Sequence, residues 1–76
     1  MIYQYMSVKE IYIDGHTSYG IAVLVHYDDG STAVLQTISA ISENPKRIRE
    51  LVRRCNENHL SPLHLQDVIE DFLAAL

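Results

Sequence analysis

The sequence predicts a single α+β domain: a three-stranded antiparallel meander with two helices packed on one face, in the order β-β-β-α-α. Two turn signals, Asp14-Gly15 and Asp29-Gly30, separate three segments rich in β-branched and aromatic residues. From residue 44 onward, apolar residues recur at the spacings of an amphipathic helix. A chain of 76 residues is long enough for one domain and no more.

The three strands are expected at about residues 2–13, 18–27 and 31–39. In the first, the apolar alternation changes phase near Lys9-Glu10, which predicts a bulge or two short strands. The second is apolar on both faces, as is typical of a central strand. We therefore expect the sheet order to follow the chain, with the second strand in the middle.

A two-residue loop at Asp29-Gly30 sets the predicted register of the second and third strands. It places Val25 opposite Val34 and Ile21 opposite Ile38. These aliphatic pairs predict the face that the helices cover.

The other face of the predicted sheet pairs Leu24 with Leu35 and His26 with Ala33. Two helices can cover only one face, so this second face is expected to stay uncovered although it is also apolar. Its predicted apolar residues are Tyr3, Tyr5, Ala22, Leu24, Ala33 and Leu35.

Two helices are expected at about residues 45–58 and 62–75. Asn44-Pro45 and Ser61-Pro62 each place a capping side chain before a proline at the first helical position. The apolar stripe of the first helix is Ile48, Leu51, Val52 and Cys55. That of the second is Leu65, Val68, Ile69, Phe72, Leu73 and Leu76.

Composition narrows the function classes. The net charge of −4 argues against nucleic acid as the main partner. A single cysteine, Cys55, excludes an internal disulfide and fits a reducing compartment. No targeting segment is visible, and the longest aliphatic run, residues 21–25, is too short to span a bilayer. We therefore expect a cytoplasmic protein with no membrane partner.

Three stretches carry a resemblance to a known family: Thr17-Ser18-Tyr19-Gly20-Ile21, Cys55-Asn56 and the segment from His64 to Leu73. Together they resemble a family of small uncharacterised proteins from anaerobic Gram-positive bacteria, over most of the chain from Tyr12 onward. The family is a domain of unknown function, so the resemblance implies no catalytic residue, cofactor or partner. It draws attention to four polar residues whose role beyond helix start and solubility is open: His64, Asp67, Glu70 and Asp71.

Cysteine and histidine residues near the helices raise the question of a metal or catalytic site. Cys55, His59 and His64, with Asp67 and Asp71, are ligand types that suit zinc. However, Cys55 falls on the buried stripe of the first helix, where cysteine acts as a small hydrophobe, and no Cys-x-x-Cys pair is present. A buried thiol is also a poor nucleophile. We expect no metal, no cofactor and no catalytic residue, hence no enzyme.

The first helix carries most of the positive charge. Its five basic residues offer a candidate nucleic-acid-binding face: Lys46, Arg47, Arg49, Arg53 and Arg54. The alternative is a solvated face partly neutralised by Glu43, Glu50 and Glu57. No aromatic residue interleaves with the cations, so nucleic acid is disfavoured but kept as the alternative partner.

The uncovered apolar face favours a small non-enzymatic protein-interaction or regulatory module. Apolar patches of this kind mark contacts with other proteins. We expect self-association as a homodimer through Tyr3, Tyr5, Leu24 and Leu35, with another protein as a further partner. The identity of that partner, the pathway and any ligand are beyond the sequence.

Overall fold

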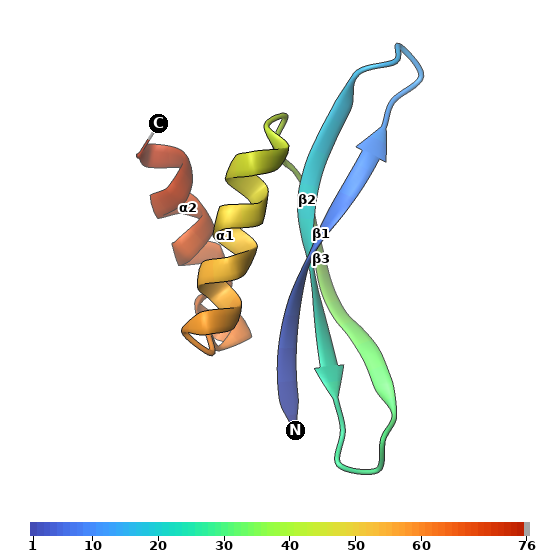
Figure 1. Cartoon of the computed structure of the whole chain (residues 1–76), viewed down its shortest axis with the longest axis vertical. Helices are drawn as coiled ribbons and strands as arrows, with labels where there is room; N and C mark the ends of the chain where they lie inside the picture. Colours follow the sequence, from blue (N-terminus) through green and yellow to red (C-terminus); the bar gives the residue numbers. More distant parts are fainter. Residues whose placement is uncertain (76) are drawn as a thin grey trace.

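The computed structural model, which describes residues 1–75, has the predicted α+β architecture. Three strands, β1 (Ile2–Ile11), β2 (Thr17–His26) and β3 (Thr32–Ser42), form one antiparallel sheet in the order β1-β2-β3. Helix α1 (Pro45–Glu57), the short 3-10 turn η1 (Pro62–His64) and helix α2 (Leu65–Ala74) follow. Both helices lie on one side of the sheet, with α1 next to the strands and α2 outside it (Figure 1). The fold class and element order are therefore confirmed.

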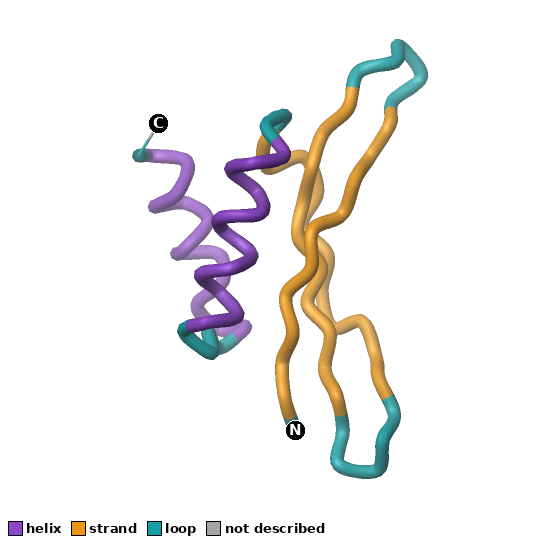
Figure 2. The backbone as a smooth tube through the Cα atoms, viewed as in Figure 1, coloured by secondary structure: helices purple, strands orange, loops and turns teal. Residues whose placement is uncertain are grey.

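Both hairpin turns depend on a glycine with positive φ. Gly15 (φ 89°) closes the β1–β2 turn and Gly30 (φ 90°) closes the β2–β3 turn. A residue without a Cβ adopts this conformation without steric cost. The two turns project beyond the helices at opposite ends of the sheet (Figure 2).

The β2–β3 turn is one residue longer than predicted, and this changes the register. The backbone N–H of Tyr27 donates to the carbonyl of Ser31 at 2.9 Å, so three residues rather than two form the loop. Val25 consequently pairs with Ala33, and the predicted Val25–Val34 pair is wrong. A three-residue loop with a glycine in the left-handed region is the next most common hairpin connection.

A bulge in β3 restores the predicted register of β2 and β3 further from the turn. Leu24 pairs with Val34 but Val23 pairs with Gln36, so Leu35 is an extra residue in β3 and the strand has a bulge there. The bulge restores the predicted pairing of Ile21 with Ile38. The predicted pairs of Leu24 with Leu35 and His26 with Ala33 are wrong, because both lie between the turn and the bulge.

The first strand also differs from its prediction. The β1–β2 ladder runs from Ile2 to Ile11 without a register shift, so no bulge lies near Lys9-Glu10. The ladder pairs Tyr3 with Val25 and Tyr5 with Val23. Since paired residues share a face, both tyrosines lie under the helices, and their predicted place on the uncovered face is wrong.

The core lies between the covered face of the sheet and the two helices. Tyr5 of β1 is 2% exposed and belongs to a cluster with aliphatic side chains from β2, β3 and both helices. The other buried members of this cluster are Ile21, Val23, Ile41, Ile48, Leu51, Cys55, Leu65 and Ile69. The predicted stripes of both helices thus pack over the sheet, except for Leu73, which is 39% exposed. Leu76, predicted to extend the second stripe, lies outside the described residues.

Polar contacts attach the helices to β1. The Asn56 side chain accepts from the backbone N–H of Tyr5 at 2.8 Å and donates to the Tyr5 carbonyl at 3.0 Å. The Tyr5 hydroxyl donates to the carbonyl of Leu60 at 2.6 Å. β1 is an edge strand, and within residues 1–75 no fourth strand pairs with its free edge. Asn56 therefore satisfies the Tyr5 backbone groups that a neighbouring strand would otherwise bind.

Helix α1 begins at its predicted cap, whereas the second predicted cap, Ser61, begins the 3-10 turn η1 and not α2. The Asn44 side chain accepts from the backbone N–H groups of Lys46 (3.0 Å) and Arg47 (3.4 Å), ahead of Pro45. The Ser61 hydroxyl accepts from Leu63 N–H at 3.4 Å. After Pro62, however, the chain first makes a 3-10 turn and becomes α-helical only at Leu65.

Replacing the first of these caps tests its contribution. We expect Asn44→Ala to lower the free energy of unfolding by about 1 kcal/mol, because two N–H groups of the first turn lose their acceptor. Urea denaturation followed by circular dichroism measures the change. Glu43→Ala, at an exposed neighbouring residue, is the control and should leave the midpoint unchanged. Equal midpoints for Asn44→Ala and the control would contradict this role.

Candidate functional site

The sheet face opposite the helices is apolar at its centre. On this face Met6 of β1 pairs with Ala22, and Leu24 of β2 pairs with Val34 of β3. Met6 is 44% exposed and Val34 63% exposed, although both are large hydrophobic residues. We call this surface, made of Met6, Val8, Ala22, Leu24 and Val34, the uncovered face. Leu35 at the bulge is 52% exposed.

Polar side chains lie at both ends of the uncovered face, and at one end they are joined by Ile2, which pairs with His26 and is 68% exposed. Toward the β2–β3 turn, His26 contacts the Gln4 amide oxygen at 2.7 Å and the Thr32 hydroxyl at 3.2 Å. Toward the other end, the Glu10 carboxylate accepts from the backbone N–H of Ala40 at 3.1 Å. An apolar centre between polar margins is the usual anatomy of a protein interface.

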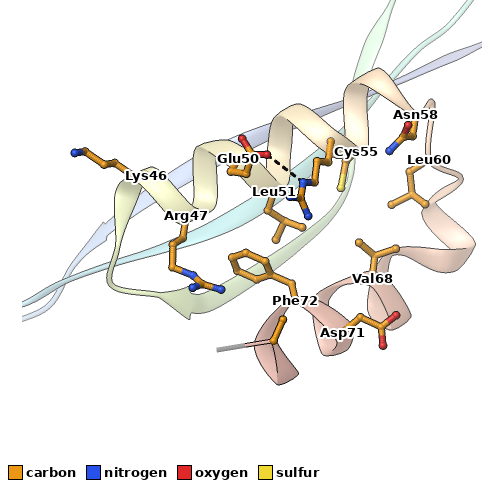
Figure 3. Close-up of a pocket in the computed structure, with 12 residues that line it drawn as sticks. Lys46, Arg47, Glu50, Leu51, Cys55, Asn58, Leu60, Val68, Asp71 and Phe72 are labelled. Atoms are coloured by element: carbon orange, nitrogen blue, oxygen red, sulfur yellow. Dashed lines mark hydrogen bonds and ion pairs between the residues drawn. The ribbon is translucent and has the colours of Figure 1, made fainter.

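A second feature is a groove between the two helices, with a cavity of about 600 Å³. Its apolar lining comes from both helices and from the connection between them: Leu51, Cys55, Leu60, Val68 and Phe72. Figure 3 shows Phe72 and Val68 of α2 projecting toward α1. We call this feature the helix groove.

Arg47 enters the helix groove from α1. Its guanidinium carbon lies 4.7 Å from the centre of the Phe72 ring, a cation–π distance. Its Nε is buried and has no hydrogen-bond partner among residues 1–75. Figure 3 shows the guanidinium beside Phe72, at the end of the groove farthest from Leu60.

Cys55 forms part of the groove wall but is 2% exposed. Burial raises the pKa of its thiol, which disfavours the nucleophilic thiolate at neutral pH. The residue therefore acts as a packing group in this structure.

Comparison with known proteins places the chain in a family. A model of the DUF6514 family, described as a family of unknown function, matches residues 1–75. The chain belongs to this family. No curated protein and no solved structure matches the chain. The predicted family of unknown function is thus confirmed for this DUF6514 protein, while its range among anaerobic Gram-positive bacteria stays a prediction.

The five basic residues of the DUF6514 chain do not form one free cationic face. Arg53 is ion-paired with Glu50 and with Glu57, and Arg54 is ion-paired with Glu50 at 3.1 Å. Hydrogen bonds from Arg53 lower the pKa of the Glu50 carboxyl, which keeps it charged. Arg47 turns into the helix groove instead.

Lys46 and Arg49 are the remaining two cations of the alternative nucleic-acid site, and both are exposed. Two cations make a small footprint for phosphate binding. Binding of nucleic acid stays an untested alternative.

The polar residues singled out by the resemblance are spread over α2 and the turn before it. His64 and Asp67 are exposed, and Glu70 accepts from the Gln66 amide at 3.4 Å. Asp71 lines the helix groove. Among residues 1–75, no three histidine, cysteine, aspartate or glutamate side chains are grouped so as to hold a metal ion.

No helix within the described part of the DUF6514 chain has the length and hydrophobicity needed to cross a membrane.

The helix groove is not predicted by the sequence patterns. One signal for it was present, because Arg47 lies four residues before Leu51 and eight before Cys55, on the same helical face. The packing of Phe72 against that face is a long-range contact that helical periodicity does not reveal.

Proposed function

We propose that this DUF6514 protein is a non-enzymatic interaction module that forms a homodimer through the uncovered face. The observation that supports it is the row of exposed apolar side chains on a sheet face with no helix over it. On this face Met6 of β1 and Val34 of β3 are exposed to solvent, and Leu24 of the central strand β2 is half-buried between them. Apolar patches on small soluble domains usually mark contacts with other proteins.

A second copy of the chain fits this surface. A two-fold dimer buries the same patch on both partners, so one apolar face suffices. The polar groups at both ends of the face, around His26 and Glu10, form part of its rim. A chain of this size also buries only ~60% of its unfolded surface as a monomer, so additional burial stabilises it.

Sedimentation velocity at micromolar concentration tests the proposal. We expect a species of twice the 8.7 kDa monomer mass. Val34→Lys should raise the dimer dissociation constant at least tenfold, because it buries an unpaired charge in the apolar centre. Val34 is already 63% exposed in the monomer, so the variant should remain folded.

Ile13→Lys is the matched control, because Ile13 is fully exposed on the β1–β2 turn and outside the uncovered face. It should leave the sedimentation profile unchanged. A wild-type monomer at these concentrations overturns the proposal. Equal dissociation in both variants would also overturn it and would point to the turn instead. If a different protein covers the face, the wild-type chain should sediment as a monomer by itself and form a complex only when that protein is present.

A further inference from the structure

We propose that the helix groove binds a small carboxylate with an apolar chain. The carboxylate lies against Arg47, and the chain lies along Leu51, Val68 and Phe72. This site is separate from the uncovered face, since the helices and that face are on opposite sides of the sheet (Figure 1).

The size and lining of the helix groove fit such a ligand. The cavity of about 600 Å³ lies in the range of roughly 300–1,000 Å³ that is typical of small-molecule sites. Most of its wall is apolar, with charged groups at its margins. Ligand sites of this kind combine an apolar wall with a few polar groups that set orientation.

Arg47 supplies the polar group. It differs from Arg53 and Arg54, which are each ion-paired with a glutamate. The Nε of Arg47 is buried and has no hydrogen-bond partner within residues 1–75. A buried donor without an acceptor is unfavourable, and a carboxylate matches the planar guanidinium through two parallel hydrogen bonds.

Among residues 1–75, the acidic groups that line the groove are Glu50 and Asp71, and neither is ion-paired with Arg47. Glu50 is already shared by Arg53 and Arg54. Figure 3 shows the Asp71 carboxylate far from the Arg47 guanidinium and pointing away from it, and the Lys46 ammonium group extending outward. Lys46 and Arg54 also line the groove, but Arg54 is already paired with Glu50, so within residues 1–75 Arg47 is the guanidinium of the groove that has no ion pair. One such guanidinium suits one carboxylate.

Titration of the full chain with decanoate, below its micelle-forming concentration, tests the proposal by ¹⁵N–¹H NMR. We expect saturable shifts at the amides of Val68 and Phe72, with those of Met6 and Val34 unmoved. Decanol has the same chain without the charge, and it should bind at least tenfold more weakly. This comparison uses only the wild-type protein.

Two variants locate the ligand. Arg47→Met keeps the apolar stem but removes the charge, and it should weaken decanoate binding at least tenfold. Arg49→Met is the matched control, since Arg49 is exposed on the same helix and outside the groove. Val68→Phe fills the cavity and should abolish binding while the circular dichroism spectrum stays that of the wild type.

Several results would overturn the site. These are no shifts with millimolar decanoate, equal affinity for decanol, and equal effects of Arg47→Met and Arg49→Met. Shifts confined to Met6, Leu24 and Val34 would place the ligand on the uncovered face instead. A monomeric wild type with decanoate in the groove would reject the proposed dimer while leaving this site in place.

Discussion

Gly20→Ala is expected to destabilise the protein by about 3 kcal/mol or more, a large part of the ~5 kcal/mol available to a small domain. A Cβ at Gly20 would lie 2.1 Å from the Ile38 carbonyl oxygen and 3.1 Å from the Ser39 Cα. Both obstacles are backbone atoms of β3, which no side-chain rotation can move. Gly20 lies between Tyr19 and Ile21, where the β2–β3 register shifts, so relief requires the two strands to separate.

Thermal unfolding followed by circular dichroism measures this effect, with Gly15→Ala as the control. Gly15 has a positive φ, but apart from Gly15 and its two chain neighbours no atom of the described residues lies within 4 Å of the position that an alanine methyl group would take there. Its substitution should cost only the ~1–2 kcal/mol of a left-handed alanine. If Gly20→Ala unfolds at the same temperature as Gly15→Ala, the close approach of β3 is not a constraint on folding.

Tyr5→Ala is expected to lower the free energy of unfolding by about 3–5 kcal/mol. The ring is 2% exposed, between the sheet and both helices, so its removal leaves a cavity in the centre of the core. The variant also loses the hydroxyl that donates to the Leu60 carbonyl at 2.6 Å, which joins β1 to the helix connection. Urea denaturation at neutral pH measures the loss.

Tyr5→Phe is the matched variant, and it separates the hydroxyl from the ring. We expect it to cost about 1 kcal/mol, because only the hydrogen bond to Leu60 is removed. A loss for Tyr5→Ala no larger than that for Tyr5→Phe would show that the ring does not pack in the core.

The raised pKa of Tyr5 predicts that the protein loses stability at alkaline pH. Burial, with smaller effects from Cys55 and Tyr3, raises the pKa of Tyr5 from 10.0 to about 12. Between these values the unfolded chain releases the phenolic proton while the folded chain keeps it. The free energy of unfolding should therefore be unaffected by Tyr5 below pH 10 and fall between pH 10 and pH 12. This contribution should be absent in Tyr5→Phe, and identical alkaline profiles for the two proteins would contradict it.

The fold class follows from local patterns in the chain. Turn glycines at residues 15 and 30, helical spacing after residue 44 and the caps Asn44 and Ser61 are each readable within a few neighbouring residues. They act through short-range sterics and hydrogen bonds, so they predict element type and order without knowledge of distant contacts. The buried stripes Ile48–Leu51–Cys55 and Leu65–Ile69 were identified for the same reason.

The assignment of residues to the two sheet faces depended on long-range pairing. One additional loop residue and the bulge at Leu35 moved Val34 to the uncovered face, and the uninterrupted β1–β2 ladder placed Tyr5 under the helices. A one-residue change of register turns every affected side chain to the opposite face, and local alternation does not report such a change. The helix groove likewise arises where Arg47 meets Phe72, two residues separated by the whole helix connection. Residue patterns therefore establish which elements form, whereas strand register and helix packing establish which side chains are available to a partner or a ligand.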